Sequence, residues 1–257
     1  MSQHEKAAAF RALHEGEPFV IPNPWDAGAA RMLEALGFHA LATTSSGFAF
    51  TLGRLDGGAM LDEVVEHVRV MCAATSLPVA VDLENGYGPP GAAITRVAEA
   101  GAVGGSIEDF DGSRLYDLEE AVERVAAAVE AARALDFPFT LTARAENHLH
   151  GVTDIEDTIA RLQAYERAGA DVLFAPGLRS TDQVRAIVSA VSRPVNVLGH
   201  AGFTMAELVE AGAQRVSVGG ALTWVGVAAA AEAAERVRDG DFSVLTARPP
   251  VKEWLAD

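Results

Sequence analysis

Short apolar runs alternate along this chain with longer segments in which apolar residues recur at helical spacing. The apolar runs lie near residues 19, 40, 79, 104, 140, 172, 195 and 216, and each reads as one short buried strand. Segments with the spacing of amphipathic helices separate the runs. The alternation predicts strand–helix units built around a parallel sheet.

The joints between these units follow two residue patterns. At four of them a helical segment ends at a glycine suited to a left-handed C-cap, and a short strand follows: Gly37, Gly101, Gly169 and Gly212. At three others a proline stands at the strand entrance, where its missing N–H costs little: Pro78, Pro138 and Pro194. Such repeated joints indicate one architecture used throughout the chain.

Eight strands alternating with helices are most simply closed as an α/β fold of the (β/α)8 TIM-barrel type, one domain spanning residues 1–257. An open doubly wound sheet is the alternative, but its G-x-G-x-x-G dinucleotide fingerprint is absent from the sequence. No linker or low-complexity segment divides the chain. In a barrel of this type the chemistry collects at the carboxyl ends of the strands.

Composition narrows the choice of partners and compartment. The 257 residues carry a formal net charge of −16, which disfavours nucleic acid and anionic membrane surfaces as partners. Cys72, the single cysteine, excludes an internal disulfide, and its helical context indicates core packing rather than catalysis. The sequence lacks both the apolar run of a signal peptide and a membrane-spanning segment. We therefore expect a cytoplasmic protein.

Acidic residues follow two neighbouring predicted strands. Asp82 and Glu84 come after the run at residues 77–81, and residues two apart on a strand share a face. Glu108 ends the next strand, and adjacent strands lie about 5 Å apart. Carboxylates with no Cys or His beside them favour Mg²⁺, or Mn²⁺, over zinc. A solvated acidic turn is the alternative for Asp82 and Glu84.

Other strand ends carry groups that suit an anionic ligand. Arg144 ends the fifth strand, where it either reaches a ligand on the metal or forms a structural ion pair with Glu108. The small residues at 43–48 let backbone N–H groups approach a carboxylate, unless they form an ordinary turn. Asn196 and His200, at the seventh strand, either line the pocket or cap a loop. No lysine at a strand end offers Schiff-base chemistry.

At these residues the chain resembles the isocitrate lyase and phosphoenolpyruvate mutase superfamily, over residues 23–221. The order and spacing of the matching pieces form a specific signature, although each piece is short. The pieces are Asn23-Pro24-Trp25-Asp26, Thr44-Ser45-Ser46-Gly47-Phe48, Asp56, the Asp82-x-Glu84-x-Gly86-x-Gly88 run, Ser106-Ile107-Glu108-Asp109 and Ala143-Arg144.

The resemblance implies a Mg²⁺-dependent enzyme that handles a 2-oxo acid or its enolate. It implies that Asp82 binds the metal and, through it, the substrate, while three further carboxylates hold the metal's waters: Asp56, Glu84 and Glu108. It assigns the substrate carboxylate to the backbone N–H groups of Ser46 and Gly47, and the oxo or enolate oxygen to Arg144. The catalytic set expected is Arg144, Asp56 and Glu108, with Asn196 as a further substrate contact.

The resemblance also implies a homo-oligomer, a dimer or tetramer in which the last helix is exchanged between subunits. The Ala-rich segment at residues 224–237 is the candidate for that helix.

Two departures from the superfamily pattern weaken the case for isocitrate-type cleavage. The loop after the fourth strand lacks the Lys-x-Cys-Gly motif of those lyases, and the loops after strands 6 and 7 lack their Pro-Glu and Thr-Glu pairs. The proton donor is therefore unassigned among four candidates: Asp109, Ser113, Glu146 and His200.

The sequence thus predicts a Mg²⁺-dependent lyase that makes or breaks a C–C bond next to a small 2-oxo or 2-hydroxy (di)carboxylic acid, through a metal-held enolate. Oxaloacetate decarboxylation or hydrolysis, and P–C hydrolysis of a phosphonopyruvate-type acid, are the alternatives within this chemistry. A barrel that only binds a 2-oxo acid is the alternative of another class. A sugar-phosphate enzyme using the Gly219-Gly220 turn is a third.

Overall fold

Eight parallel strands form the centre of the computed structural model, which describes residues 1–256. In the sheet the strand order is β1-β8-β7-β6-β5-β4-β3-β2. Between the two edge strands, the Ala42 N–H donates to the Pro22 carbonyl at 3.1 Å, which brings the sheet close to a closed barrel. The strands are β1 (Phe19–Ile21), β2 (Leu41–Ala42), β3 (Val79–Asp82), β4 (Gly104–Glu108), β5 (Thr140–Arg144), β6 (Val172–Phe174), β7 (Val195–Leu198) and β8 (Arg215–Ser217).

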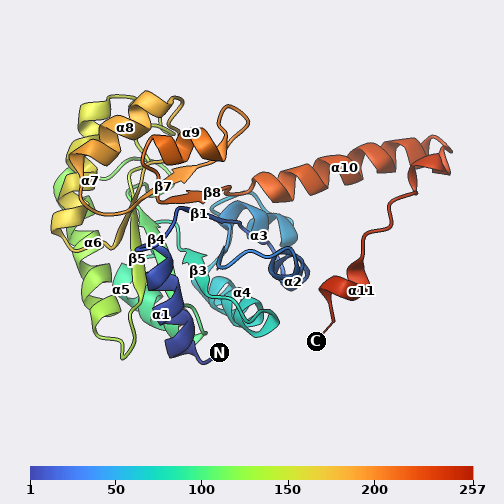
Figure 1. Ribbon diagram of the computed structural model, residues 1–257, viewed down its shortest axis with the longest axis horizontal. Coiled ribbons are helices and arrows are strands. Elements are labelled where there is room, and N and C mark those ends of the chain that lie inside the picture. Colours follow the sequence, from blue (N-terminus) through green and yellow to red (C-terminus); the bar gives the residue numbers. More distant parts are fainter. Residues whose placement is uncertain (257) are drawn as a thin grey trace.

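Helices surround the strands on the outside of the barrel (Figure 1). They begin where the sequence supplies caps: the Asp26 carboxylate, for example, accepts the Ala29 N–H at 2.7 Å, as expected for an N-cap. The helices are α1 (Gln3–Leu13), α2 (Ala27–Ala35), α3 (Ser45–Thr51), α4 (Leu61–Ala74), α5 (Pro90–Glu99), α6 (Leu118–Arg133), α7 (Ile155–Arg167), α8 (Thr181–Ala190) and α9 (Met205–Glu210). The (β/α)8 prediction is confirmed.

The glycines at the helix–strand joints adopt the conformation that the sequence predicts. All four have positive φ, between 87° and 111°: Gly37, Gly101, Gly169 and Gly212. At Gly101 a Cβ would lie 2.9 Å from the Cβ of Cys72, so close packing adds to the conformational requirement. Burial raises the pKa of the Cys72 thiol to about 11, which agrees with the expected packing role.

The apolar core lies mainly between strands and helices, where the large side chains are buried. Several of the side chains that line a cavity inside the barrel are small, in a fold whose interior is normally filled by bulky branched residues. They include Ala42, Ala80, Ser106, Thr142 and Ser217. The barrel therefore retains an open interior beneath the carboxyl ends of its strands.

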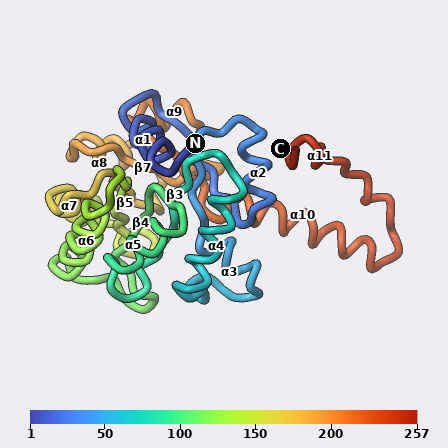
Figure 2. The backbone as a smooth tube through the Cα atoms, turned by 90° about the horizontal axis from the view of Figure 1, so that it is seen from below, coloured from blue at the N-terminus to red at the C-terminus, as the bar shows by residue number. Residues whose placement is uncertain are grey.

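After β8 the chain leaves the barrel as α10 (Ala221–Arg238), which projects away from the other helices (Figures 1 and 2). Thr223 is its only buried residue within the described part of the chain. Beyond η1 (Phe242–Val244), α11 (Val251–Trp254) returns against α2, where Arg31 donates to the Leu255 carbonyl at 3.0 Å.

The prediction that residues 1–257 form one domain stays a prediction, and Asp257 lies outside the described residues. Within residues 1–256 no helix combines the length and apolar character needed to cross a membrane.

Candidate active site

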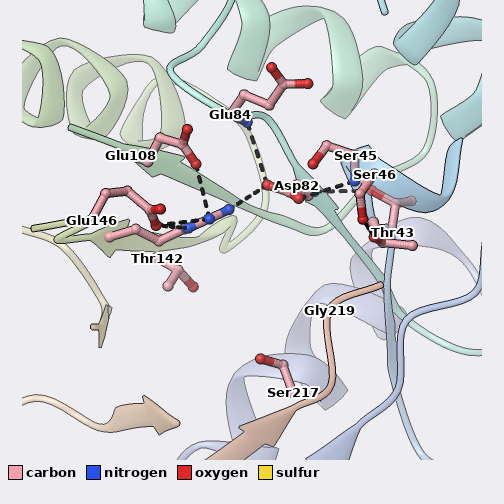
Figure 3. Close-up of polar contacts among 12 residues, drawn as sticks. Thr43, Ser45, Ser46, Asp82, Glu84, Glu108, Thr142, Glu146, Ser217 and Gly219 are labelled. Carbon is pink, nitrogen blue, oxygen red and sulfur yellow. Dashed lines mark hydrogen bonds and ion pairs between the residues drawn. The ribbon is translucent and has the colours of Figure 1, made fainter. Parts of the chain in front are cut away.

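Asp82 lies at the carboxyl end of β3, where the end of β2 holds it in place. The Asp82 N–H donates to Thr43 Oγ1 at 3.0 Å, and the Ser45 N–H donates to Asp82 Oδ2 at 3.1 Å. Figure 3 shows Asp82 between Thr43 and Ser45, which follow β2, on one side and Glu108 and Glu146 on the other. Its carboxylate is thereby fixed at the mouth of the barrel.

Arg144, at the end of β5, draws three carboxylates together. Its Nη1 lies 2.6 Å from Asp82 Oδ1, and its Nη2 lies 3.0 Å from Glu108 Oε2 and 2.8 Å from Glu146 Oε1. The parallel register pairs Glu108 directly with Arg144. The ion pair that the sequence offered as an alternative role for Arg144 is thus present, and Arg144 also lines two cavities.

Glu84 departs from the expected geometry. Because β3 ends at Asp82, Glu84 lies in the following turn, so the expectation that the two residues share a strand face is wrong. The Glu84 carboxyl points away from Asp82 (Figure 3) and accepts the Tyr87 hydroxyl at 2.7 Å. Both Glu84 and Tyr87 have positive φ, 47° and 53°. Such conformations cost about 1–3 kcal/mol each and cluster at functional sites.

Two cavities meet at this cluster. The inner cavity, of about 280 Å³, runs into the barrel interior; its upper part is lined by Ser46 and Asp82, and its floor by Asn196 and Arg215. The outer cavity, of about 550 Å³, lies toward solvent. Its lining includes Glu84, Glu108, Phe110, Glu146 and His150. Asp56 and Arg144 line both cavities, so the predicted carboxylates and guanidinium line two adjoining cavities.

The electrostatics of the site are dominated by crowded acids. Burial raises the pKa of Glu84 to about 7; the Tyr87 hydrogen bond opposes this shift and the charges of Asp82 and Asp56 add to it. Burial also raises the pKa of Glu108 well above its usual value, against the effect of Arg144. Burial alone would lower the pKa of Arg144, but the surrounding carboxylates raise it well above its usual value. The site therefore carries more negative charge than Arg144 balances.

Ser46 and Gly47, the predicted carboxylate contacts, lie in the first turn of α3. Ser46 lines the inner cavity, while the Gly47 N–H donates to Thr44 Oγ1 at 3.3 Å. A Cβ on Gly47 would lie 2.6 Å from both Thr223 Oγ1 and Thr44 Cγ2, so only glycine fits there. Their backbone contact to a substrate stays a prediction.

Comparison with known proteins shows to which family the chain belongs. The sequence model described as phosphoenolpyruvate phosphomutase matches residues 10–238. This chain belongs to the phosphoenolpyruvate mutase family. The resemblance noted in the sequence is thereby confirmed.

Relatives within the family carry several activity names. The chain is 34% identical over 232 residues to oxaloacetate decarboxylase of Bradyrhizobium sp. (strain BTAi1), covering 85% of this chain and 79% of the relative. It is 32% identical over 211 residues to 2-methylisocitrate lyase of Escherichia coli (strain K12), covering 76% and 70%. The crystal structure of a putative lyase/mutase from Burkholderia cenocepacia J2315 superposes with a TM-score of 0.96 at 50% identity, covering 99% and 98%.

The donor set of this phosphoenolpyruvate mutase family member fits a hard divalent cation. Its carboxylates are all oxygen donors, and the charges of neighbouring carboxylates add to the effect of burial in raising the pKa values of Glu84 and Glu108. Within residues 1–256 no three Asp, Glu, His or Cys side chains are grouped closely enough to ligate one ion directly. Mg²⁺ usually keeps several waters, so carboxylates can also hold it through water.

Of the four expected proton donors, two have their polar groups engaged inside the protein. Asp109, 2% exposed, accepts the Glu146 N–H at 2.7 Å and the Tyr165 hydroxyl at 2.5 Å, so it suits an anchor better than a donor. Glu146 is paired with Arg144. The Ser113 hydroxyl donates a hydrogen bond to Asp111 on an exposed loop. Among the described residues, His200 is not one of those that line the two cavities.

Sequence reasoning missed His150 and Arg215. His150 lines the outer cavity, stacks on Phe110 with ring centroids 3.5 Å apart, and has its Nε2 4.0 Å from Glu146 Oε2. Its place in the loop after β5, four residues beyond Glu146, is the signal that could have found it. Arg215 begins β8, whereas the site residues expected from the sequence lie at the carboxyl ends of the strands.

Proposed function

We propose that this protein is a Mg²⁺-dependent lyase that makes or breaks a C–C bond next to a small 2-oxo or 2-hydroxy acid. The observation that carries the proposal is Arg144, held between Asp82, Glu108 and Glu146 where the two cavities meet. Family membership and the names of its relatives support the same reaction class.

Four carboxylates would hold the cation, with Asp82 as the direct ligand and three others acting through water: Asp56, Glu84 and Glu108. When bound, Mg²⁺ supplies a Lewis acid that polarises the substrate oxygen. Mn²⁺ suits the same oxygen donors.

Side chains and backbone N–H groups of the protein supply the other interactions of the proposed reaction. Arg144 donates to the oxo oxygen and stabilises the negative charge that this oxygen gains as the neighbouring bond breaks. Its orientation is set by Glu146, which accepts from Arg144 Nε at 3.0 Å. The Ser46 N–H, and the Gly47 N–H in exchange for its bond to Thr44 Oγ1, orient the substrate carboxylate. In this proposal His150, which lines the outer cavity, exchanges a proton at Nε2 with the leaving fragment.

We expect His150→Gln to lower kcat by about 10²-fold, which is typical for loss of a general acid. The KM for the acid should change little, because in the proposed mechanism Arg144 and the α3 N–H groups bind the substrate and His150 only transfers the proton. Steady-state kinetics with His200→Gln as the matched control tests this assignment. Wild-type kcat in His150→Gln, or an equal loss in His200→Gln, would remove His150 from the reaction.

Oxaloacetate decarboxylation is the second candidate. It is favoured by the loop after β4, residues 110–115, which has no thiol to act on the leaving fragment, and by the similarity to oxaloacetate decarboxylase. Hydrolysis of the P–C bond of a phosphonopyruvate-type acid, which releases inorganic phosphate, is the third candidate.

A panel of small oxo and hydroxy acids, assayed with Mg²⁺ for pyruvate, glyoxylate, CO₂ and phosphate, separates the candidates. Mg²⁺-dependent release of pyruvate or glyoxylate from a hydroxy acid supports the lyase, and CO₂ from oxaloacetate supports the decarboxylase. Calorimetric binding of panel members without turnover of any would instead favour a barrel that only binds 2-oxo acids.

We also propose a cytoplasmic homo-oligomer in which α10 is exchanged between subunits. Support comes from the exposed apolar side chains of α10, where Val225 is 68% and Trp224 44% exposed.

Val225→Glu is expected to shift the mass measured by light scattering from that of a dimer or tetramer toward that of a monomer, because it places a charge in the exchanged interface. Glu235→Gln, on the same helix, is the control that should leave the mass unchanged. A wild-type protein of monomer mass would contradict the exchange.

A further inference from the structure

The floor of the inner cavity carries an unusual cation. Arg215 is 6% exposed and lines the same cavity as Arg144. Its Nε donates to Asn196 Oδ1 at 2.8 Å, its Nη2 to Thr142 Oγ1 at 2.9 Å and its Nη1 to His14 Nε2 at 3.1 Å. A guanidinium has five N–H groups, so these three bonds leave two donors.

All three partners of Arg215 are uncharged. Burial lowers the pKa of His14 to about 3, and Arg215 adds to this shift, so the imidazole is neutral and its Nε2 accepts. Its Nδ1 lies 2.9 Å from the Phe10 carbonyl, the partner expected of the protonated nitrogen. Burial lowers the pKa of Arg215 itself to about 9, with no carboxylate to oppose the shift.

Other arginines with little exposed side chain differ in this respect. Arg144 is paired with three carboxylates, and Arg161 with Asp109 and Asp157. Arg215 forms no ion pair within residues 1–256. A buried charge without a counter-charge is costly, so its persistence beside a cavity indicates that a ligand supplies the missing negative charge.

Two hydroxyl groups near Arg215 are arranged as further donors. Thr142 Oγ1 accepts from Arg215, and Ser217 Oγ accepts from Asn196 Nδ2 at 2.9 Å. Within the described residues neither hydroxyl donates to a protein acceptor, and both side chains line the inner cavity. Each O–H is therefore free to donate to a ligand oxygen. Figure 3 shows Thr142 and Ser217 beyond the row formed by Glu146, Glu108 and Asp82, on the side away from Glu84.

We propose that Arg215, with Thr142 and Ser217, binds a second carboxylate of the ligand, so that the inner cavity selects a four- or five-carbon dicarboxylic 2-oxo or 2-hydroxy acid. The inference rests on the proposed function, in which Arg144 takes the oxo or hydroxy end. Thr142 and Arg144 are two residues apart on β5, about 7 Å along the strand, which a short diacid spans. The volume of about 280 Å³ lies below the range for drug-sized ligands and suits a small acid.

Lactate and malate form the matched pair of probes, because malate is lactate with a carboxylate added at the far end. Titration calorimetry with Mg²⁺ is expected to show that the wild type binds malate about 10- to 100-fold more tightly than lactate, the usual contribution of a charge-assisted contact. In Arg215→Gln the malate affinity should fall to that of lactate, while the lactate affinity stays within about 3-fold. Arg133→Gln, an arginine outside both cavities, should keep the preference.

Thr142→Val and Ser217→Ala provide an independent readout should Arg215→Gln fail to fold. Each removes a hydroxyl donor and is expected to lower malate affinity about 3- to 10-fold without changing lactate affinity. Equal affinity of the wild type for malate and lactate would overturn the second-carboxylate site, and so would a parallel loss of both affinities in these variants. Those results leave the proposed function standing. Failure of the wild type to bind any panel acid would overturn both.

Discussion

Replacing Arg144 with methionine is expected to reduce kcat/KM for 2-oxo acid turnover by about 10²- to 10³-fold, the effect of removing one donor to a developing oxyanion. The same change leaves Asp82, Glu108 and Glu146 close together without their shared cation. Removing one partner of a buried ion pair costs about 3–5 kcal/mol of stability. Steady-state kinetics and thermal unfolding of the same preparation measure both effects.

Arg144→Lys is the matched variant for this experiment. Lysine keeps the positive charge among the carboxylates but loses the planar fork, so it should recover much of the stability and only part of the activity. Wild-type kcat/KM in Arg144→Met would show that the guanidinium serves the fold alone. Equal losses of activity and stability in the Lys and Met variants would contradict a role for charge.

Replacing Asp82 with alanine is expected to abolish Mg²⁺-dependent turnover, because the variant loses the one carboxylate assigned as a direct ligand. Asp56→Asn is the comparison. Loss of a carboxylate that acts through water is expected to lower metal affinity or activity by only about 10- to 100-fold. The dependence of initial rate on Mg²⁺ concentration distinguishes the two variants. If Asp82→Ala keeps its response to Mg²⁺, the metal role given to this residue is wrong.

The strand–helix alternation was sufficient to predict the barrel, because each unit carries its own local signals. Gly101 and Gly169 cap their helices as the sequence predicts, and Asp26 caps α2. The convergence of Asp82, Glu108 and Arg144 followed from the fold, since parallel strands in a barrel end at one mouth. Family membership was readable from the same residues, because the motif pieces lie at those strand ends.

The parts that escaped prediction depend on where a strand begins and ends. The sequence predicts Glu84 on a strand face, but β3 ends at Asp82 and the strained turn directs the Glu84 carboxyl away from Asp82. Arg215 belongs to the first position of β8, and only the three-dimensional packing reveals that its side chain reaches Thr142 across the barrel. His150 lies in a loop, where the spacing of apolar residues does not predict which way a side chain points.

In the proposed mechanism the strand-end carboxylates hold a divalent cation beside a ligand bound by Arg144. Titration of Mn²⁺, followed by the electron paramagnetic resonance signal of the free ion, measures this binding. The wild type should bind one Mn²⁺ per chain and bind it more tightly when a 2-oxo acid is present, and Asp82→Ala should lose this site. An Asp82→Ala protein that binds Mn²⁺ like the wild type, or a wild-type site indifferent to the acid, would contradict the account.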